Sequence, residues 1–203
     1  MEKNKIYIVA SYTDTVPGKM IKLRANMKFW NRYAGDGYSH VSLSRDNTLN
    51  NMMSFARKKM DNPFDSGLVK EDINQGMFAL KPDKSKIAVM EVDVTKQQYD
   101  DIGTIMEDYW NRRDELGFNF LGLISMLFCA RGLPVENHYF CSQWVTSVLH
   151  EAGVDIFSEK KPHNVRPFDF YCLLEDKIIY EGMTKDYCVD DNTSFQKKLK
   201  EEK

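Results

Sequence analysis

The fold is decided by the stretch YSHVSLSRDNTLNNMMSFAR, residues 38–57. Apolar and polar residues alternate at both of its ends, which is the period of a half-buried β-strand. Between the two alternating runs lie four polar residues, 45–48, which favour a tight turn. We therefore expect a β-hairpin whose first strand places His40 and Ser42 on the face opposite Val41.

The amino-acid composition excludes several classes of protein. The chain has 203 residues, of which 42% are hydrophobic and 29% charged, so it can bury a sizeable core. Its 28 Lys and Arg against 30 Asp and Glu give a net charge of −2, so we expect no nucleic-acid partner. The longest apolar run, 118–130, is too short to span a bilayer. We expect one α+β domain over 1–189, followed by a polar tail over 190–203.

Hydrophobic periodicity predicts the remaining elements. Strands are expected over 5–13, 38–44, 50–57, 77–80, 86–94 and 177–183. Helices are expected over 18–32, 95–116, 118–130 and 141–152, the third of them buried. Residues 61–76 contain Pro and Gly and predict a long surface loop. Thr95 and Gln98 have the spacing of a capping box at the start of the second helix.

The expected helix over 18–32 carries five basic residues and no acidic ones. Such a basic amphipathic pattern is consistent with peripheral contact to an anionic membrane. A helix that faces the core and exposes a solvated basic face also explains the pattern, and it is the more common structure for such a sequence.

Cys141 is the best candidate for a nucleophile. It stands at the first turn of an amphipathic helix, where unpaired N–H groups and the helix dipole favour a thiolate. A thiol nucleophile needs a base, and the chain has four histidines. His150 lies half a helical turn away from Cys141, and His138 and His163 are in expected loops, which leaves His40 on its strand.

A third residue usually orients the histidine ring. If the hairpin turn is centred on Asn47, strand partners sum to 94 and Ser54 faces His40. Another register would bring in Asn51, Glu91 or Asp93 instead. Ser54 is therefore the expected third residue.

No metal or cofactor is expected. The chain has no CxxC pair, no HExxH motif and no glycine-rich phosphate loop. Its four cysteines do not require a disulfide framework in a chain of this size. The N-terminal apolar run, 6–10, is shorter than that of a signal peptide, so we expect a cytoplasmic protein.

Two motifs carry a family resemblance. YSHVSL at 38–43, followed about a hundred residues later by FCSQWV at 140–145, resembles the circularly permuted branch of the NlpC-type papain-like cysteine hydrolases. This branch comprises the YiiX-like and lecithin:retinol-acyltransferase-like proteins, in which the histidine strand precedes the cysteine helix. The Arg166-Pro167-x-Asp169 stretch is similar to a Pro-Asp element in these relatives. The resemblance implies a papain-like α+β fold with an antiparallel sheet packed against helices.

The resemblance also implies acyl transfer through a thioester on Cys141, with His40 as the base. Tyr38 and Ser142 are expected at the substrate or oxyanion site. The substrate would be an amide or ester in a small molecule, a peptide or an acyl lipid. A non-catalytic binding module that holds a lipid, a wall fragment or a partner protein is the alternative, and a structural protein with a buried cysteine is a third.

Overall fold

The computed structural model describes residues 4–12, 38–59, 62, 65–80, 83–129 and 131–189. The expected basic helix over 18–32 and the polar tail over 190–203 lie outside these residues.

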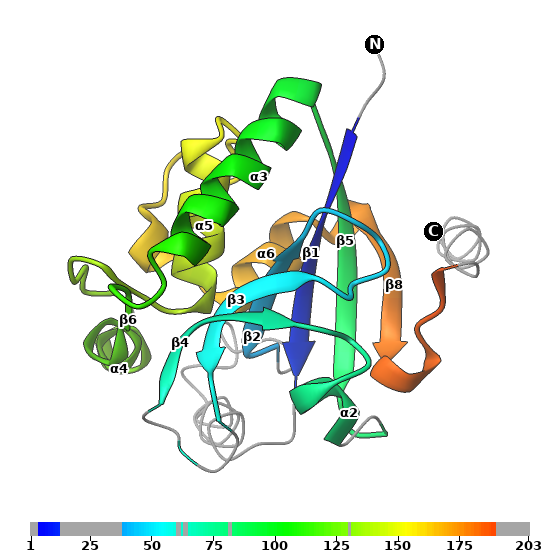
Figure 1. Cartoon of the computed structure of the whole chain (residues 1–203), viewed down its shortest axis with the longest axis horizontal. Coiled ribbons are helices and arrows are strands. Elements are labelled where there is room, and N and C mark those ends of the chain that lie inside the picture. Colours follow the sequence, from blue (N-terminus) through cyan, green and yellow to red (C-terminus); the bar gives the residue numbers. More distant parts are fainter. Residues whose placement is uncertain are drawn as a thin grey trace.

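A six-stranded antiparallel sheet forms the centre of the fold (Figure 1), in the order β4-β3-β2-β1-β5-β8. Its strands are β1 (Asn4–Tyr12), β2 (His40–Ser44), β3 (Met52–Arg57), β4 (Ser66–Glu71), β5 (Lys86–Val94) and β8 (Ile178–Met183). The antiparallel sheet packed against helices makes the described part of the chain an α+β protein, as expected from the sequence.

Helices α3 (Lys96–Asn111), α5 (Cys141–Glu151) and α6 (Pro167–Leu173) pack against one face of the sheet. The short α2 (Gly76–Leu80) precedes β5, and α4 (Phe120–Cys129) lies at the periphery beside the two-stranded parallel pair β6 (Gly117–Phe118) and β7 (His138–Tyr139). Three 3-10 turns complete the described chain: η1 (Pro162–Asn164), η2 (Glu175–Lys177) and η3 (Thr184–Asp186).

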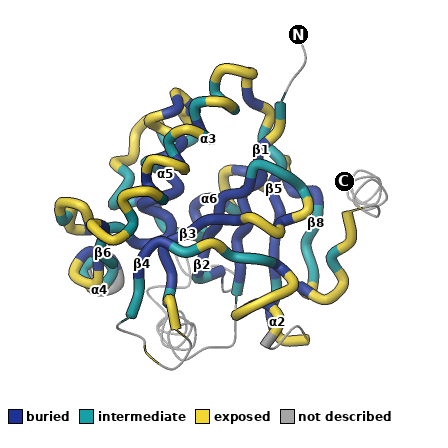
Figure 2. The backbone as a smooth tube through the Cα atoms, viewed as in Figure 1, coloured by how far each residue is buried: buried dark blue, intermediate teal, exposed yellow. Residues whose placement is uncertain are grey.

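The central strands of the sheet are buried on both faces, and they are dark blue in Figure 2. On the helix-covered face, Val41 and Leu43 of β2 join the larger core, which includes Trp144 of α5. The opposite face holds a smaller cluster around Val9 and Met52. All five residues of β2 are consequently buried, the polar ones included.

Local signals explain where α3 and α5 begin and end. At the start of α3, Thr95 Oγ accepts a hydrogen bond from Gln98 N at 3.2 Å, and Gln98 Oε1 accepts one from Thr95 N at 3.0 Å. This confirms the predicted capping box, which pairs two N–H groups that the helix leaves free. Beyond the end of α5, Gly153 takes a φ of 70°, a left-handed value that glycine adopts without strain.

Three local predictions were wrong. The expected strand over 77–80 is part of helix α2, and the expected loop over 61–76 contains strand β4. The helix expected over 118–130 forms as α4, but it is not wholly buried, since Leu121 is 66% and Ile124 51% exposed. Within the described part of the chain, no helix has both the length and the apolar character needed to cross a bilayer.

Candidate active site

Cys141 is the first residue of α5, and its side chain is buried. Phe140, the N-cap residue, provides no side-chain hydrogen bond to the helix. Capping side chains normally take up the first N–H groups of a helix, so here those groups remain available to an anion next to the thiol. Helix α5 packs against β2, which brings Cys141 to the histidine strand.

His40 is the first residue of β2 and is held by a carboxylate. Its Nε2 lies 3.0 Å from Oε1 and 3.1 Å from Oε2 of Glu71. Ser42 Oγ donates to Glu71 Oε2 at 2.5 Å and lies 3.2 Å from the same histidine nitrogen. The side chains of both partners are nearly covered, only 11% and 9% exposed. This geometry fixes the plane of the ring and leaves its other nitrogen, Nδ1, for a second partner.

The charges of this site are coupled. Burial by itself lowers the pKa of His40, but the Glu71 carboxylate and a hydrogen bond with the Cys141 thiol outweigh burial, so this pKa lies well above its usual range. Burial raises the pKa of Glu71, but the charge and hydrogen bond of His40 and the hydrogen bond from Ser42 outweigh it and lower this pKa. The site therefore favours an imidazolium between the carboxylate and the thiol.

Glu71 was not among the residues that the sequence suggested. It is the last residue of β4, inside the segment expected to be a loop, and β3 lies between β4 and the histidine strand. Adjacent strands are about 4.8 Å apart, so Glu71 and His40 meet only because both long side chains reach across β3. No local signal in the sequence identifies Glu71, since the contact depends on strand order and register.

The expected role of Ser54 as third residue needs correction. Leu43 pairs with Met53, so partners on β2 and β3 sum to 96 and not to 94 as predicted. Ser54 Oγ donates to the Val41 carbonyl at 2.6 Å and not to His40. The hydroxyl thus satisfies a buried backbone acceptor.

The register gives Ser54 a different part in the site. Extending the Leu43–Met53 pairing by one residue places Ser54 beside Ser42, and Ser54 pairs with Val69, two residues before Glu71. Ser54 therefore lies on β3 between the strands of Ser42 and Glu71, on the face that these two side chains share. A small side chain at this position leaves room for the ion pair.

The residues expected at the oxyanion or substrate site have other partners for their hydroxyls. Tyr38 donates to Glu181 Oε1 at 2.9 Å and stacks on Tyr171 of α6 with ring centroids 5.0 Å apart. Ser142 Oγ donates to the Val165 carbonyl at 2.6 Å. Ser142 still follows Cys141 in the first turn of α5, so it stands beside the thiol through its backbone.

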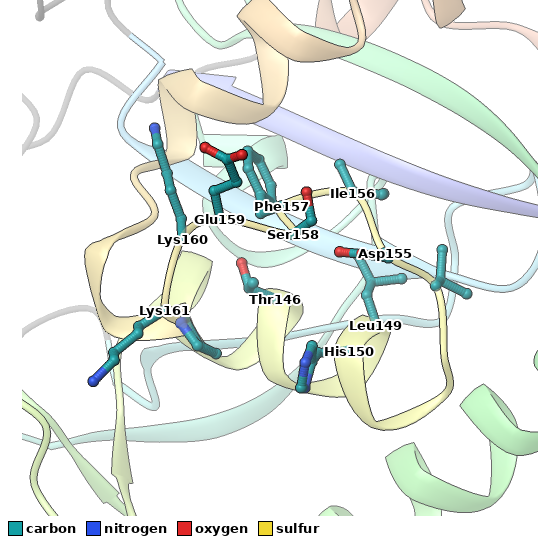
Figure 3. A pocket seen from close by; sticks show the side chains of 12 residues that line it. Thr146, Leu149, His150, Asp155, Ile156, Phe157, Ser158, Glu159, Lys160 and Lys161 are labelled. Carbon is teal, nitrogen blue, oxygen red and sulfur yellow. The ribbon is translucent and has the colours of Figure 1, made fainter.

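The other three histidines lie away from this arrangement. His138 bonds the Glu136 carbonyl through Nδ1 at 2.7 Å, and burial together with Lys161 lowers the pKa of His163. His150 lines a cavity of about 380 Å³ between the C-terminal half of α5 and residues 154–162 (Figure 3). None of the residues that line this cavity is Cys141, His40 or Glu71, so it is separate from the candidate active site.

Over the described ranges, no three His, Cys, Asp or Glu side chains are grouped so that they could share a metal ion. No family model, curated protein or solved structure matches this chain.

Proposed function

We propose that the protein is a thiol-dependent hydrolase or acyltransferase that cleaves an amide or ester bond through a thioester on Cys141. The observation that carries this proposal is the buried His40, held by Glu71 at Nε2 and in contact with a thiol at a helix start. A nucleophile, a proton-transferring base and a group that orients the base are the three parts that such catalysis needs.

The reaction follows from these positions. The Cys141 thiolate attacks the carbonyl carbon, and the N–H groups of the first turn of α5 stabilise the oxyanion. The His40 imidazolium gives its proton to the leaving amine or alcohol as the carbon–heteroatom bond breaks. Neutral His40 then takes a proton from water or from another acceptor, which attacks the thioester and releases the acyl group. Glu71 stabilises the imidazolium at the start and end of this cycle.

The order of the two motifs supports the same proposal. A histidine strand ahead of a cysteine helix resembles the circularly permuted NlpC-type papain-like hydrolases, and β2 and α5 supply these elements here. The carboxylate beside His40 strengthens this assignment, because a carboxylate stabilises imidazolium and a serine does not.

An activated ester tests the proposal without knowledge of the natural substrate. The protein is mixed with p-nitrophenyl butyrate, nitrophenolate release is followed, and the acylated residue is located by mass spectrometry. We expect an acyl group on Cys141 in the wild type, no such adduct in Cys141→Ala, and an unchanged burst in Cys172→Ala, which removes an exposed thiol. Acylation confined to the exposed thiols would reject catalysis and favour the binding module.

A further inference from the structure

Helix α4 has the sequence FLGLISMLFC, which contains no charged residue. Such an apolar helix would normally be buried, but part of its surface faces solvent. Phe120 is 37%, Leu121 66% and Ile124 51% exposed, and Leu133 of the following loop is 53% exposed. We call the three helical residues, Phe120, Leu121 and Ile124, the α4 patch. Single exposed apolar residues are ordinary on protein surfaces, but a contiguous group marks an interaction site.

The patch is one continuous surface. At about 100° per residue, Phe120, Ile124 and Leu121 fall within about 100° of one another around the helix. On the other side of α4, Met126 and Gly122 are buried against the protein. The helix is therefore anchored by one side and presents the three apolar side chains on the other.

Specific contacts hold Leu133 beside the helix. Asn119 Nδ2 donates to the Leu133 carbonyl at 2.9 Å, and Ser125 Oγ donates to the Arg131 carbonyl at 2.7 Å. A Cβ atom on Gly122 would lie 2.6 Å from the Leu133 carbonyl oxygen, so the absence of a side chain there permits this approach. Leu133 therefore lies against the Gly122 side of α4, and these contacts fix the side by which the helix is anchored.

From this surface we infer that α4 docks the protein onto a lipid bilayer, with the α4 patch inserted among the acyl chains. At about 150–250 Å² per large side chain, the exposed fractions of these three residues amount to on the order of 300 Å² of apolar surface. A stable protein dimer buries about 800 Å² on each partner, more than twice this amount. None of the three residues is a Trp, Tyr or Arg, the types that dominate protein–protein hot spots.

The position of α4 links the lipid surface to the candidate active site. Asn119, which precedes the helix, also donates to Gln143 Oε1 at 3.2 Å, two residues beyond Cys141. Docking through the patch would hold the start of α5 near the bilayer surface. The docking itself does not require catalysis, so its test is independent of the proposed function.

The test measures co-sedimentation with vesicles of pure phosphatidylcholine in 0.5 M NaCl. A neutral lipid at high salt suppresses binding through basic segments, because such binding depends on anionic lipid and is screened. We expect the wild type to bind and L121Q/I124Q to lose affinity by about tenfold or more, since two apolar side chains become polar. The matched control is Leu173→Gln on α6, where a leucine is 50% exposed on another part of the surface.

Each outcome decides the inference. Binding by the wild type and the control, but not by L121Q/I124Q, supports it, provided that thermal unfolding shows all three proteins folded. Failure of the wild type to bind, or equal binding by L121Q/I124Q, overturns it. Binding only to anionic vesicles at low salt overturns it in favour of a basic segment. A dimer in sedimentation velocity that L121Q/I124Q dissociates, without vesicle binding, overturns it in favour of a second copy.

Discussion

Replacing Glu71 by Gln removes the charge beside His40 and keeps the size of the side chain. In the wild type, both carboxylate oxygens lie within 3.1 Å of Nε2 in a site where neither side chain is more than 11% exposed. Removing one partner of a buried pair costs about 3–5 kcal/mol when the other charge must stay buried. In the E71Q variant, His40 can avoid this cost in part by releasing its proton. We therefore expect the free energy of unfolding of E71Q to be lower than that of the wild type by about 3 kcal/mol at pH 5.5.

The sign of the pH dependence follows from the two pKa shifts. The raised pKa of His40 contributes stability that is fully present below its unfolded pKa of about 6.5 and is lost as pH rises through the folded value. The lowered pKa of Glu71 contributes stability that is present above about 4.5 and is lost as pH falls through its folded value. The free energy of unfolding of the wild type should therefore exceed that of E71Q most between about pH 4.5 and pH 6.5. At pH 9 the difference should be only about 1 kcal/mol, because hydrogen bonds are then the main difference between the two proteins.

Urea unfolding at pH 5.5 and pH 9 measures both differences. Glu91→Gln is the matched control, because Glu91 pairs with Lys5 at 2.7 Å on the same sheet but the lysine is 47% exposed. An exposed pair is worth about 0–1 kcal/mol, so E91Q should differ little from the wild type at either pH. A loss in E71Q that is equal at pH 5.5 and pH 9 would refute the ion pair.

Three further predictions concern single side chains. In His40→Gln, iodoacetamide should alkylate Cys141 at pH 6.5 at least tenfold more slowly, while the exposed cysteines of the same molecules react unchanged. Ser54→Ala should lower the free energy of unfolding in urea by about 1–3 kcal/mol, because the buried Val41 carbonyl loses its donor, but Cys141 should react with iodoacetamide as in the wild type. In Ser54→Leu, the larger side chain should displace Glu71 and Cys141 should lose this reactivity. Equal Cys141 reactivity in the two variants would contradict the need for a small side chain at position 54. In Gly132→Ala, the new Cβ would stand 1.7 Å from the His163 carbonyl oxygen, so thermal unfolding should occur several degrees lower; an unchanged midpoint would contradict this close contact.

Elements with a strong local period were predictable from the sequence. Strand β5 has the predicted bounds, 86–94, and α5 ends one residue before the predicted end. Strand β4 was missed because Gly67 weakens a strand and its segment is short. The structure tolerates this glycine at the sheet edge, where a Cβ would lie 2.8 Å from the Lys58 side chain.

The residues of the candidate site were likewise predictable only where a single local element determines them. Cys141 and His40 each follow from one element, the start of a helix and the alternation of a strand. Glu71 depends on three non-local facts: the existence of β4, its place beyond β3, and a hairpin register that sums to 96. A register error of two residues keeps every side chain on its correct face, so alternation could not reveal it.

The alternation of the hairpin has a physical cause that the sequence alone did not reveal. A polar row on a strand normally faces water, but Ser42, Ser44 and Ser54 are all fully buried. Buried hydroxyls are costly unless they are bonded, and each of these donates to a carboxylate or a backbone carbonyl. Ser42 orients Glu71, and the small Ser54 leaves room for Glu71 on the same face. Ser42 and Ser54, on the polar face of the predicted hairpin, therefore support the histidine inside the protein, while Ser44 bonds the turn at Asp46.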